Sequence, residues 1–341
     1  MSDPSAVDKV IPTIGISIGD LNGIGPEITL KALRSIGILT QLTPVIYASA
    51  QTLSFYQKIL RLSDFKFHEI QDLKEVAPGQ VNLLSIWQES LDFQPGKPSS
   101  MGGKYAKISL DQSVNDLKKK VIDGLVTAPI SKELIQKEGF DFPGHTEFLA
   151  SVFGLQENLM LMVNNQLRIG VVTGHIPLKK ISSMLTKSLI TSKLEIFLNS
   201  LITNFGIKNP KIALTGVNPH AGENGLIGSE EQEVIIPVIK EFQAAGHLVF
   251  GPYPADGFFG DDQFKNFDGI LTMYHDQGLI PFKHISMGAG VNFTAGIPAI
   301  RTSPAHGTAF DIAGKNIANP LSMINALYLA ADLAMKKLSL P

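Results

Sequence analysis

Residues 11–36 are IPTIGISIGDLNGIGPEITLKALRSI, a stretch that combines a strand, a glycine-rich turn and a helix. The run from Ile11 to Ile18 is almost continuously apolar, which is typical of a strand buried on both faces of a sheet. Pro26 stands at the start of the helix expected over residues 26–36, and Gly37 stands just past its end, the usual places for these two residues. A buried strand followed by a short turn and a helix is the repeating unit of α/β proteins.

The same alternation continues along most of the chain. Further strands are expected at residues 44–48, 81–86, 124–127, 159–163, 167–173, 211–217, 248–250, 269–273 and 299–302, and further helices at 104–120, 188–204, 230–244 and 321–337. Residues 229–232, Ser-Glu-Glu-Gln, predict a capping box at the start of the helix at 230–244, and Gly246 is placed to close it. The pattern predicts an α/β fold with a largely parallel sheet.

Composition excludes several classes of protein. With 341 residues the chain is long enough for one large or two medium domains. The net charge of −2, from 29 basic and 31 acidic residues without a long run of either sign, argues against nucleic-acid binding. No apolar run reaches the ~18 residues of a membrane span, and the N-terminal segment lacks the basic start of a secretory signal. We therefore expect a cytoplasmic protein with no membrane or nucleic-acid partner.

Three histidines are the leading candidates for chemistry. His175, His220 and His275 each lie in a short polar loop that follows an apolar run, and such loops carry the ligand sites of α/β proteins. The chain has no cysteine, so a transition-metal site would have to use histidine and carboxylate. Three converging imidazoles would leave an open coordination position for a substrate. Taken one at a time, each of the eight histidines is more often a structural residue.

Two further stretches could bind an anion. His145 and Thr146 follow Gly144 at the start of an expected helix, where free N–H groups attract negative charge, although Thr146 could equally be a simple N-cap. Lys283 and Arg301 lie in an otherwise apolar, glycine-rich stretch, where an unpaired cation is costly. Phosphate or carboxylate oxygens would satisfy them, and an ion pair with Asp268 or Asp276 is the structural alternative.

Several strings resemble known families. The turn at residues 19–27 is similar to the start of the isocitrate and isopropylmalate dehydrogenases. The string at residues 306–320, HGTAFDIAGKNIANP, is similar to their adenosine-binding segment. The metal-binding aspartates of those enzymes have no counterpart here. Six ordered motifs resemble the 4-hydroxythreonine-4-phosphate dehydrogenase family of the vitamin B6 pathway. They are TAPISK at 127–132, GHTEF at 144–148, GHIP at 174–177, NPHAGE at 218–223, YHDQG at 274–278 and RTSPAHGTA at 301–309. The chain departs from this family at Leu21-Asn22, where Pro-Ala is common.

The resemblance implies a two-domain α/β/α fold like that of isocitrate and isopropylmalate dehydrogenases, with mostly parallel sheets and a cleft between the domains. It places residues 1–130 and 280–341 in a cofactor-side domain and residues 131–279 in a metal-binding and dimerisation domain.

The same resemblance implies the site residues. His175, His220 and His275 would hold one divalent metal, Zn²⁺ or alternatively Mg²⁺ or Co²⁺, in an active site shared by a homodimer. Substrate contacts would be His145, Thr146, Lys283, Asn292 and Arg301. His306, Asp311 and Asn319 would contact NAD or NADP.

The implied reaction is oxidation of the C3 hydroxyl of 4-phosphohydroxy-L-threonine, followed by decarboxylation to 3-amino-2-oxopropyl phosphate. Asp276 is expected to orient His275, and a buried Lys283 is a candidate for the group that accepts the hydroxyl proton. Three alternatives remain: a dehydrogenase of 4-phospho-threonate or 4-phospho-erythronate, a metal-dependent hydrolase, and a non-catalytic protein that binds a phosphorylated ligand.

Overall fold

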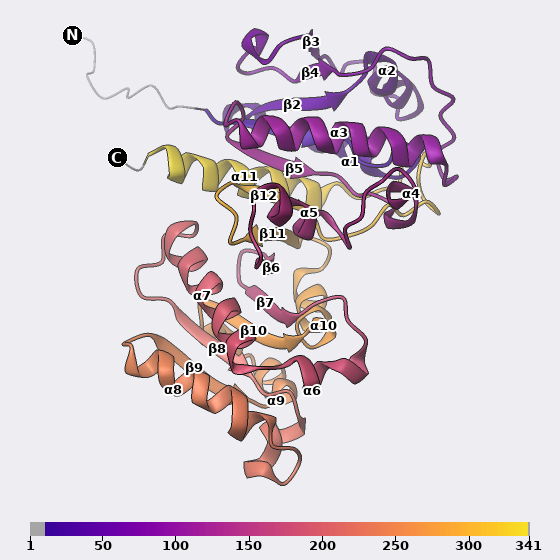
Figure 1. Ribbon diagram of the computed structural model, residues 1–341. Helices are drawn as coiled ribbons and strands as arrows, with labels where there is room; N and C mark the ends of the chain where they lie inside the picture. The colour runs from indigo at the N-terminus through magenta and orange to yellow at the C-terminus, as the bar shows by residue number, and fades with distance from the viewer. Residues whose placement is uncertain (1–10, 340–341) are drawn as a thin grey trace, which may run out of the picture. The chain divides into compact units, whose positions relative to one another are not determined.

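The computed structural model describes residues 11–339, which divide into two compact units (Figure 1). The first unit runs to Asp141 and resumes at Ala299, and the second is Phe142–Pro298. Both boundaries therefore fall later than the expected breaks after residues 130 and 279. The second boundary moves because strand β11 (Val291–Ala295) pairs antiparallel with β6 (Leu159–Val163), so that residues 280–298 belong to the second unit.

The described part of the first unit contains a parallel sheet in the order β3-β4-β2-β1-β5-β12. Its strands are β1 (Thr13–Ser17), β2 (Thr43–Ala48), β3 (His68–Ile70), β4 (Asn82–Ser85), β5 (Gly124–Thr127) and β12 (Arg301–Pro304). Every residue of β2 and β5 is buried, as a sheet covered on both faces requires. The mostly parallel α/β architecture expected from the sequence is confirmed in this unit.

The described part of this unit also contains five helices. They are α1 (Gly25–Leu33), α2 (Ala50–Ile59), α3 (Ser100–Lys118), α4 (Lys132–Gln136) and α11 (Leu321–Leu338), with short 3-10 turns at Ile38–Thr40 and Leu73–Glu75. Helix α3 packs on β1, β2 and β5, and α11 packs on β12, β5 and β1. The last helix of the chain thus lies on the first strand, which explains why the unit is built from both ends of the sequence.

The second unit has the strand order β11-β6-β7-β10-β8-β9, in which β7, β10, β8 and β9 run parallel and β6 is antiparallel to both of its neighbours. The strands not yet bounded are β7 (Arg168–Thr173), β8 (Lys211–Thr215), β9 (Leu248–Tyr253) and β10 (Gly269–Tyr274). Parallel strands place their carboxyl ends at one edge, and the loops of interest follow three of them.

The helices of the second unit are α5 (His145–Val152), α6 (Ile181–Met184), α7 (Lys187–Thr203), α8 (Ile236–Ala244), α9 (Ala255–Gly260) and α10 (His275–Ser286). A π-helical turn, Glu231–Ile235, leads into α8, and 3-10 turns occur at Leu178–Lys180, Pro219–Gly225 and Gln263–Asn266. Helices α7 and α10 both pack against β7 and β10. In this way α10 brings the residues after His275 close to the sheet edge.

The structure corrects the sequence analysis in several places. Strands β3 and β11 and helices α2, α4, α6, α9 and α10 were not expected. The capping box at residues 229–232 is also wrong: Glu230 occupies the N-cap without a side-chain hydrogen bond, and Glu231 is turned into the interior. By contrast, Gly246 has the left-handed φ of 87° expected of a helix-ending glycine.

The turn between β1 and α1 requires glycine at its start. Gly19 has φ of +75°, and a Cβ at this position would lie 2.4 Å from the backbone oxygen of Pro129. Asn22, where the chain departs from the family pattern, is fully buried and donates from its side-chain amide to Lys97 O at 3.0 Å and Ser99 Oγ at 2.9 Å. Asn22 therefore stabilises the turn through buried hydrogen bonds, although the family commonly has a different residue here.

Within residues 11–339, none of the helices combines the length and the apolar character needed to cross a bilayer.

Candidate active site

The three candidate histidines follow neighbouring strands of the second unit. His175 lies two residues after β7, His220 lies in the turn after β8, and His275 begins α10 directly after β10. The strand order β7-β10-β8 makes these strands adjacent, and all three run parallel. The three loops therefore leave the same edge of one sheet.

Two of the histidines lie together. The ring centroids of His175 and His275 are 5.5 Å apart, and both residues line a pocket of about 480 Å³. Asp276 Oδ1 lies 2.6 Å from Nδ1 of His275, an arrangement that fixes the ring and leaves Nε2 as the nitrogen open to a ligand. Paired imidazoles with a carboxylate behind one of them have the donor chemistry of a divalent transition-metal site.

His220 does not complete this group within one chain. Its side chain is exposed, on a turn in which residues 220–224 all have positive φ. Among the described residues 11–339, no three His, Asp or Glu side chains lie close enough together to hold a metal ion. A single chain thus brings together two of the three predicted ligands.

Hydrogen bonds connect the ends of the three strands. Gln277 Oε1 accepts from the N–H of Met273 and from the hydroxyl of Thr215, both at 2.8 Å, and its Nε2 donates to Gly216 O at 2.6 Å. The Thr173 hydroxyl donates to Met273 O at 2.8 Å. No role was assigned to Gln277 from the sequence, although this residue lies in the YHDQG motif. A glutamine side chain does not titrate, and its hydrogen-bond partners are visible only in the folded structure.

The first turn of α5 carries two of the predicted substrate contacts. Gly144 is the N-cap, in an extended conformation, and His145 and Thr146 follow it. The alternative that Thr146 is the N-cap is therefore wrong. Thr146 is buried, whereas His145 is half-buried.

Lys283 and Asn292 differ in their surroundings. The expected burial of Lys283 is contradicted, because the residue is exposed near the end of α10 in the single chain. Asn292, on β11, has a buried Oδ1 with no hydrogen-bond partner among the described residues. An orphaned buried oxygen of this kind is a candidate to accept a hydrogen bond from a ligand.

Arg301 is almost completely buried at the start of β12, with 1 % of its surface exposed. Its Nε and Nη2 both donate to Thr127 Oγ1, at 3.1 and 2.5 Å. Thr127 ends β5 and begins the TAPISK motif, so two of the six motifs meet through this contact. The two aspartates considered as ion-pair partners are otherwise engaged: Asp276 with His275, and Asp268 with the N–H of Lys211 at 2.8 Å.

The predicted cofactor residues lie on the segment between β12 and α11. Burial lowers the pKa of His306, whose Nε2 is buried without a hydrogen-bond partner in the described structure. Asp311 is exposed. Asn319 has a structural function that the sequence did not reveal, since its Oδ1 accepts from the N–H of Leu321 at 2.9 Å at the start of α11.

The glycine-rich turn after β1 supports this segment. The N–H of Ile24 donates to Thr308 O at 2.9 Å. The fully buried Glu27 accepts from the N–H of Ala318 at 2.9 Å and from Lys31 at 2.7 Å, and Lys31 also donates to Ala318 O at 3.1 Å. The two strings that resemble dinucleotide-dependent dehydrogenases are therefore in direct contact.

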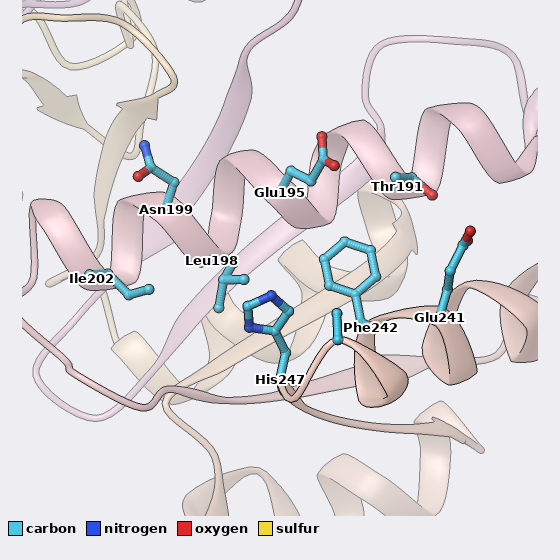
Figure 2. A pocket seen from close by; sticks show the side chains of 9 residues that line it. Thr191, Glu195, Leu198, Asn199, Ile202, Glu241, Phe242 and His247 are labelled. Carbon is cyan, nitrogen blue, oxygen red and sulfur yellow. The ribbon is translucent and has the colours of Figure 1, made fainter.

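A second pocket in the same unit, of about 440 Å³, lies between α7 and α8 (Figure 2). His247 packs against Phe242 there, with ring centroids 5.8 Å apart, and Glu195 and Glu241 also line the pocket. Its described lining includes no lysine or arginine. Two carboxylates without a cation disfavour a phosphorylated ligand, so this pocket does not compete with the histidine loops as the substrate site.

Comparison with known sequences gives a consistent result. Residues 40–330 match the family described as pyridoxal phosphate biosynthetic protein PdxA. The chain is 44% identical, over 320 residues, to the 4-hydroxythreonine-4-phosphate dehydrogenase of Bacteroides thetaiotaomicron, covering 94% of this chain and 88% of the relative. It is 40% identical, over 332 residues, to the D-threonate 4-phosphate dehydrogenase of Cupriavidus necator, covering 96% of this chain and 98% of the relative.

Solved structures agree with the sequences. The 4-hydroxythreonine-4-phosphate dehydrogenase of Klebsiella pneumoniae superposes with a TM-score of 0.82 at 34% identity, over 96% of this chain and 99% of the other. That of Burkholderia phymatum superposes with a TM-score of 0.79 at 38% identity, over 95% of this chain and 98% of the other. By sequence and by fold, the chain belongs to the pyridoxal phosphate biosynthetic protein PdxA family.

Proposed function

We propose that the chain is a 4-hydroxythreonine-4-phosphate dehydrogenase of pyridoxine biosynthesis. The enzyme oxidises the C3 hydroxyl of 4-phosphohydroxy-L-threonine with NAD or NADP, and the resulting β-keto acid loses CO₂ to give 3-amino-2-oxopropyl phosphate. The substrate is assigned from the names of the relatives. The observation that carries the proposal within the structure is the His175–His275 pair, with Asp276 on Nδ1 of His275, at the end of two adjacent parallel strands. The cytoplasm is the proposed location, in keeping with a chain that has no cysteine.

The pair fits a divalent metal in its donor chemistry, and we assign it Zn²⁺. His220 is the proposed third ligand and comes from a second copy of the chain, because it is exposed and does not join the other two within one chain. A homodimer with shared active sites follows from this arrangement. Three protein ligands would leave a coordination position for the substrate hydroxyl.

A metal held by His175, His275 and the His220 of a second copy would make the substrate hydroxyl more acidic, and a bound NAD or NADP would supply the hydride acceptor. The side chains of the protein fix the reactants. Arg301, already oriented by Thr127, anchors the substrate phosphate through its planar guanidinium, and Asp276 holds the imidazole of His275 in one orientation. His145, Thr146 and Asn292 are proposed as further substrate contacts, and His306, Asp311 and Asn319 as contacts of the dinucleotide.

Lys283 remains the proposed acceptor of the hydroxyl proton. It lies seven residues after Asp276 on α10, a spacing that places both side chains on one face of the helix. In the single chain Lys283 is exposed, so a proton-accepting role depends on the bound substrate and the second copy to remove water from it.

A second substrate is favoured by one observation. The relative from Cupriavidus necator, named for D-threonate 4-phosphate, is 40% identical to this chain, close to the 44% of the relative named for 4-hydroxythreonine 4-phosphate. The two compounds share a carboxylate, a C3 hydroxyl and a phosphate on C4. They differ at C2, which carries an amino group in the first and a hydroxyl in the second. The same residues could therefore serve either substrate.

The test is a reduced-cofactor absorbance assay with purified protein. It compares 4-phosphohydroxy-L-threonine with 4-phospho-D-threonate, each with NAD or NADP and with or without added Zn²⁺. We expect the higher kcat/KM with the amino acid and loss of turnover in strong chelator. Preference for the threonate would replace the substrate assignment, and absence of cofactor reduction with both compounds would overturn the dehydrogenase assignment itself.

A further inference from the structure

The turn that carries His220 has an unusual backbone. Five successive residues have left-handed conformations: His220 at φ 53°, Ala221 at 50°, Gly222 at 77°, Glu223 at 41° and Asn224 at 57°. Four of the five have a side chain, and left-handed backbone is unfavourable for residues with a Cβ. A run of this kind persists only where the surrounding structure imposes it.

Glu231 contacts the start of this turn from the interior of the protein. Its side chain is almost fully buried, with 1 % exposed. Oε1 accepts from the N–H groups of Val217 and Asn218, at 2.7 and 2.8 Å, and Oε2 accepts from the side-chain amide of Asn218 at 3.0 Å. One carboxylate therefore binds the two residues that lead from β8 into the turn.

Glycines surround this carboxylate because larger residues would not fit. A Cβ on Gly222 would lie 2.5 Å from Glu231 Oε2, and a Cβ on Gly216 would lie 2.9 Å from Glu231 Oε1 and 2.8 Å from Ala221 Cα. Gly222 lies in the turn itself, and Gly216 directly follows β8. The turn is thus wrapped closely around a buried charge.

A second carboxylate connects the turn to the loop that follows His175. Glu230 Oε2 accepts from the side-chain amide of Asn218 at 2.7 Å, and Glu230 Oε1 accepts from the hydroxyl of Ser182 at 2.5 Å. Ser182 belongs to α6, whose first residue, Ile181, lines the pocket of His175 and His275. Asn218 bridges the two carboxylates and so joins the loops of two proposed metal ligands.

We propose that Glu231 is a positioning residue for metal binding: it holds the strained turn so that His220 is presented, already ordered, to the metal site of a second copy. The inference rests on the proposed function, since it takes His220 as a ligand. It adds a residue that binds neither metal nor substrate and acts through its hydrogen bonds to Val217 and Asn218 at the start of the turn. Without Glu231 the turn relaxes toward ordinary backbone angles, and His220 must be ordered at the moment of binding.

The experiment uses the full chain with Zn²⁺ as the probe and compares Glu231→Gln with Glu233→Gln. Glu233 lies on the same π-helical turn and is exposed, so it is a matched control. We expect Glu231→Gln to weaken Zn²⁺ binding by about 10- to 100-fold, the effect usual for groups that orient metal ligands, and to speed amide hydrogen exchange over residues 217–224 in the metal-free protein. Glu233→Gln should change neither measurement.

Asn218→Ala provides a second variant in case Glu231→Gln does not fold. It removes the bridging amide and leaves the two backbone contacts of Glu231 in place, so we expect a smaller loss of Zn²⁺ affinity with the same local increase in exchange. Wild-type affinity and exchange in a folded Glu231→Gln or Asn218→Ala protein would overturn the inference.

His220→Ala separates this inference from the proposed function. If His220→Ala weakens Zn²⁺ binding while Glu231→Gln does not, only the role of Glu231 is wrong. If His220→Ala binds Zn²⁺ as the wild type does, the metal assignment is wrong and the role of Glu231 is wrong with it.

Discussion

Arg301 shows how a single residue connects packing with chemistry. Its guanidinium is buried and is fixed by two hydrogen bonds to one threonine hydroxyl. Burying such a group is costly unless its donors are used. A guanidinium held in one orientation can also grip a phosphate through two parallel donors, which the single ammonium of lysine cannot do.

Arg301→Lys should therefore raise KM for the phosphorylated substrate by about tenfold or more, equivalent to about 1.4 kcal/mol of binding, with little change in KM for the dinucleotide. Steady-state kinetics with each substrate varied in turn checks this. Equal increases in both KM values would show that Arg301 supports the fold rather than the phosphate.

Asp20 gives the protein a distinct pH dependence. Burial raises the pKa of Asp20 from 3.8 to about 6, and hydrogen bonds from the N–H groups of Asn22 and Gly23 offset this only in part. The folded protein therefore binds a proton that the unfolded chain releases between about pH 4 and pH 6. Since the folded state binds more protons in this window, the contribution of Asp20 to stability falls as pH rises through it. The two pKa values differ by the equivalent of about 3 kcal/mol.

Asp20→Asn should remove this contribution. Urea unfolding at a series of pH values from 4 to 7 should show that the stability of the variant, relative to the wild type, increases with pH by up to about 3 kcal/mol. The exposed Asp332→Asn serves as control and should show no such trend. A constant difference between Asp20→Asn and the wild type across this range would contradict the assignment.

At the scale of elements, α1 holds the segment that precedes α11. Glu27 and Lys31, one turn apart on α1, bind the N–H and the C=O of Ala318 respectively. These contacts join parts of the chain nearly 300 residues apart in sequence. The segment from His306 to Asn319 otherwise has little regular structure, so its conformation depends on α1.

Glu27→Ala should leave the buried N–H of Ala318 without an acceptor and destabilise the protein by about 1–3 kcal/mol. We also expect faster hydrogen exchange over residues 306–319 and a larger rise in KM for the dinucleotide than for the phosphorylated substrate. Thermal unfolding, exchange and kinetics measure the three effects.

Glu133→Ala is the matched control, because Glu133 and Lys137 form the same i,i+4 pair at the surface, with 80% and 58% of their side chains accessible. An exposed pair of this kind contributes little. If both variants behaved alike, the contact with Ala318 would have no special role.

At the scale of the whole molecule, the proposed metal site requires two copies of the chain. A test is to mix His275→Ala with His220→Ala, each inactive by itself. In a mixed dimer, one site would combine the intact His175 and His275 of one chain with the intact His220 of the other. Random pairing would then restore about a quarter of the wild-type sites.

Metal content and turnover after co-refolding measure this recovery. Refolding each variant alone controls for residual activity. If all three ligands came from one chain, mixing would restore nothing.

Much of the fold could be predicted from the sequence because it depends on local pattern. Apolar runs such as residues 124–127 and 159–163 coincide with β5 and β6, and the helix expected at 321–337 is α11. Strand β11 was not predicted because Asn292 interrupts its apolar run. Helix α10 was not predicted because its first turn resembles a polar loop and Pro281 lies inside it. In both cases packing overrides a weak local signal.

The sequence by itself determined the α/β class, the six ordered motifs and, through them, the family and the identity of the candidate residues, because these depend on residue type and spacing. Only the tertiary structure decided which of these residues meet. It brought His175 and His275 together, buried Arg301 against Thr127, left Lys283 exposed, and turned Glu231 inward to hold the turn of His220. The physical reason is that burial and hydrogen-bond partners come from segments distant in the chain, so a charged residue has the same appearance in sequence whether it lies in solvent or holds a strained turn in place.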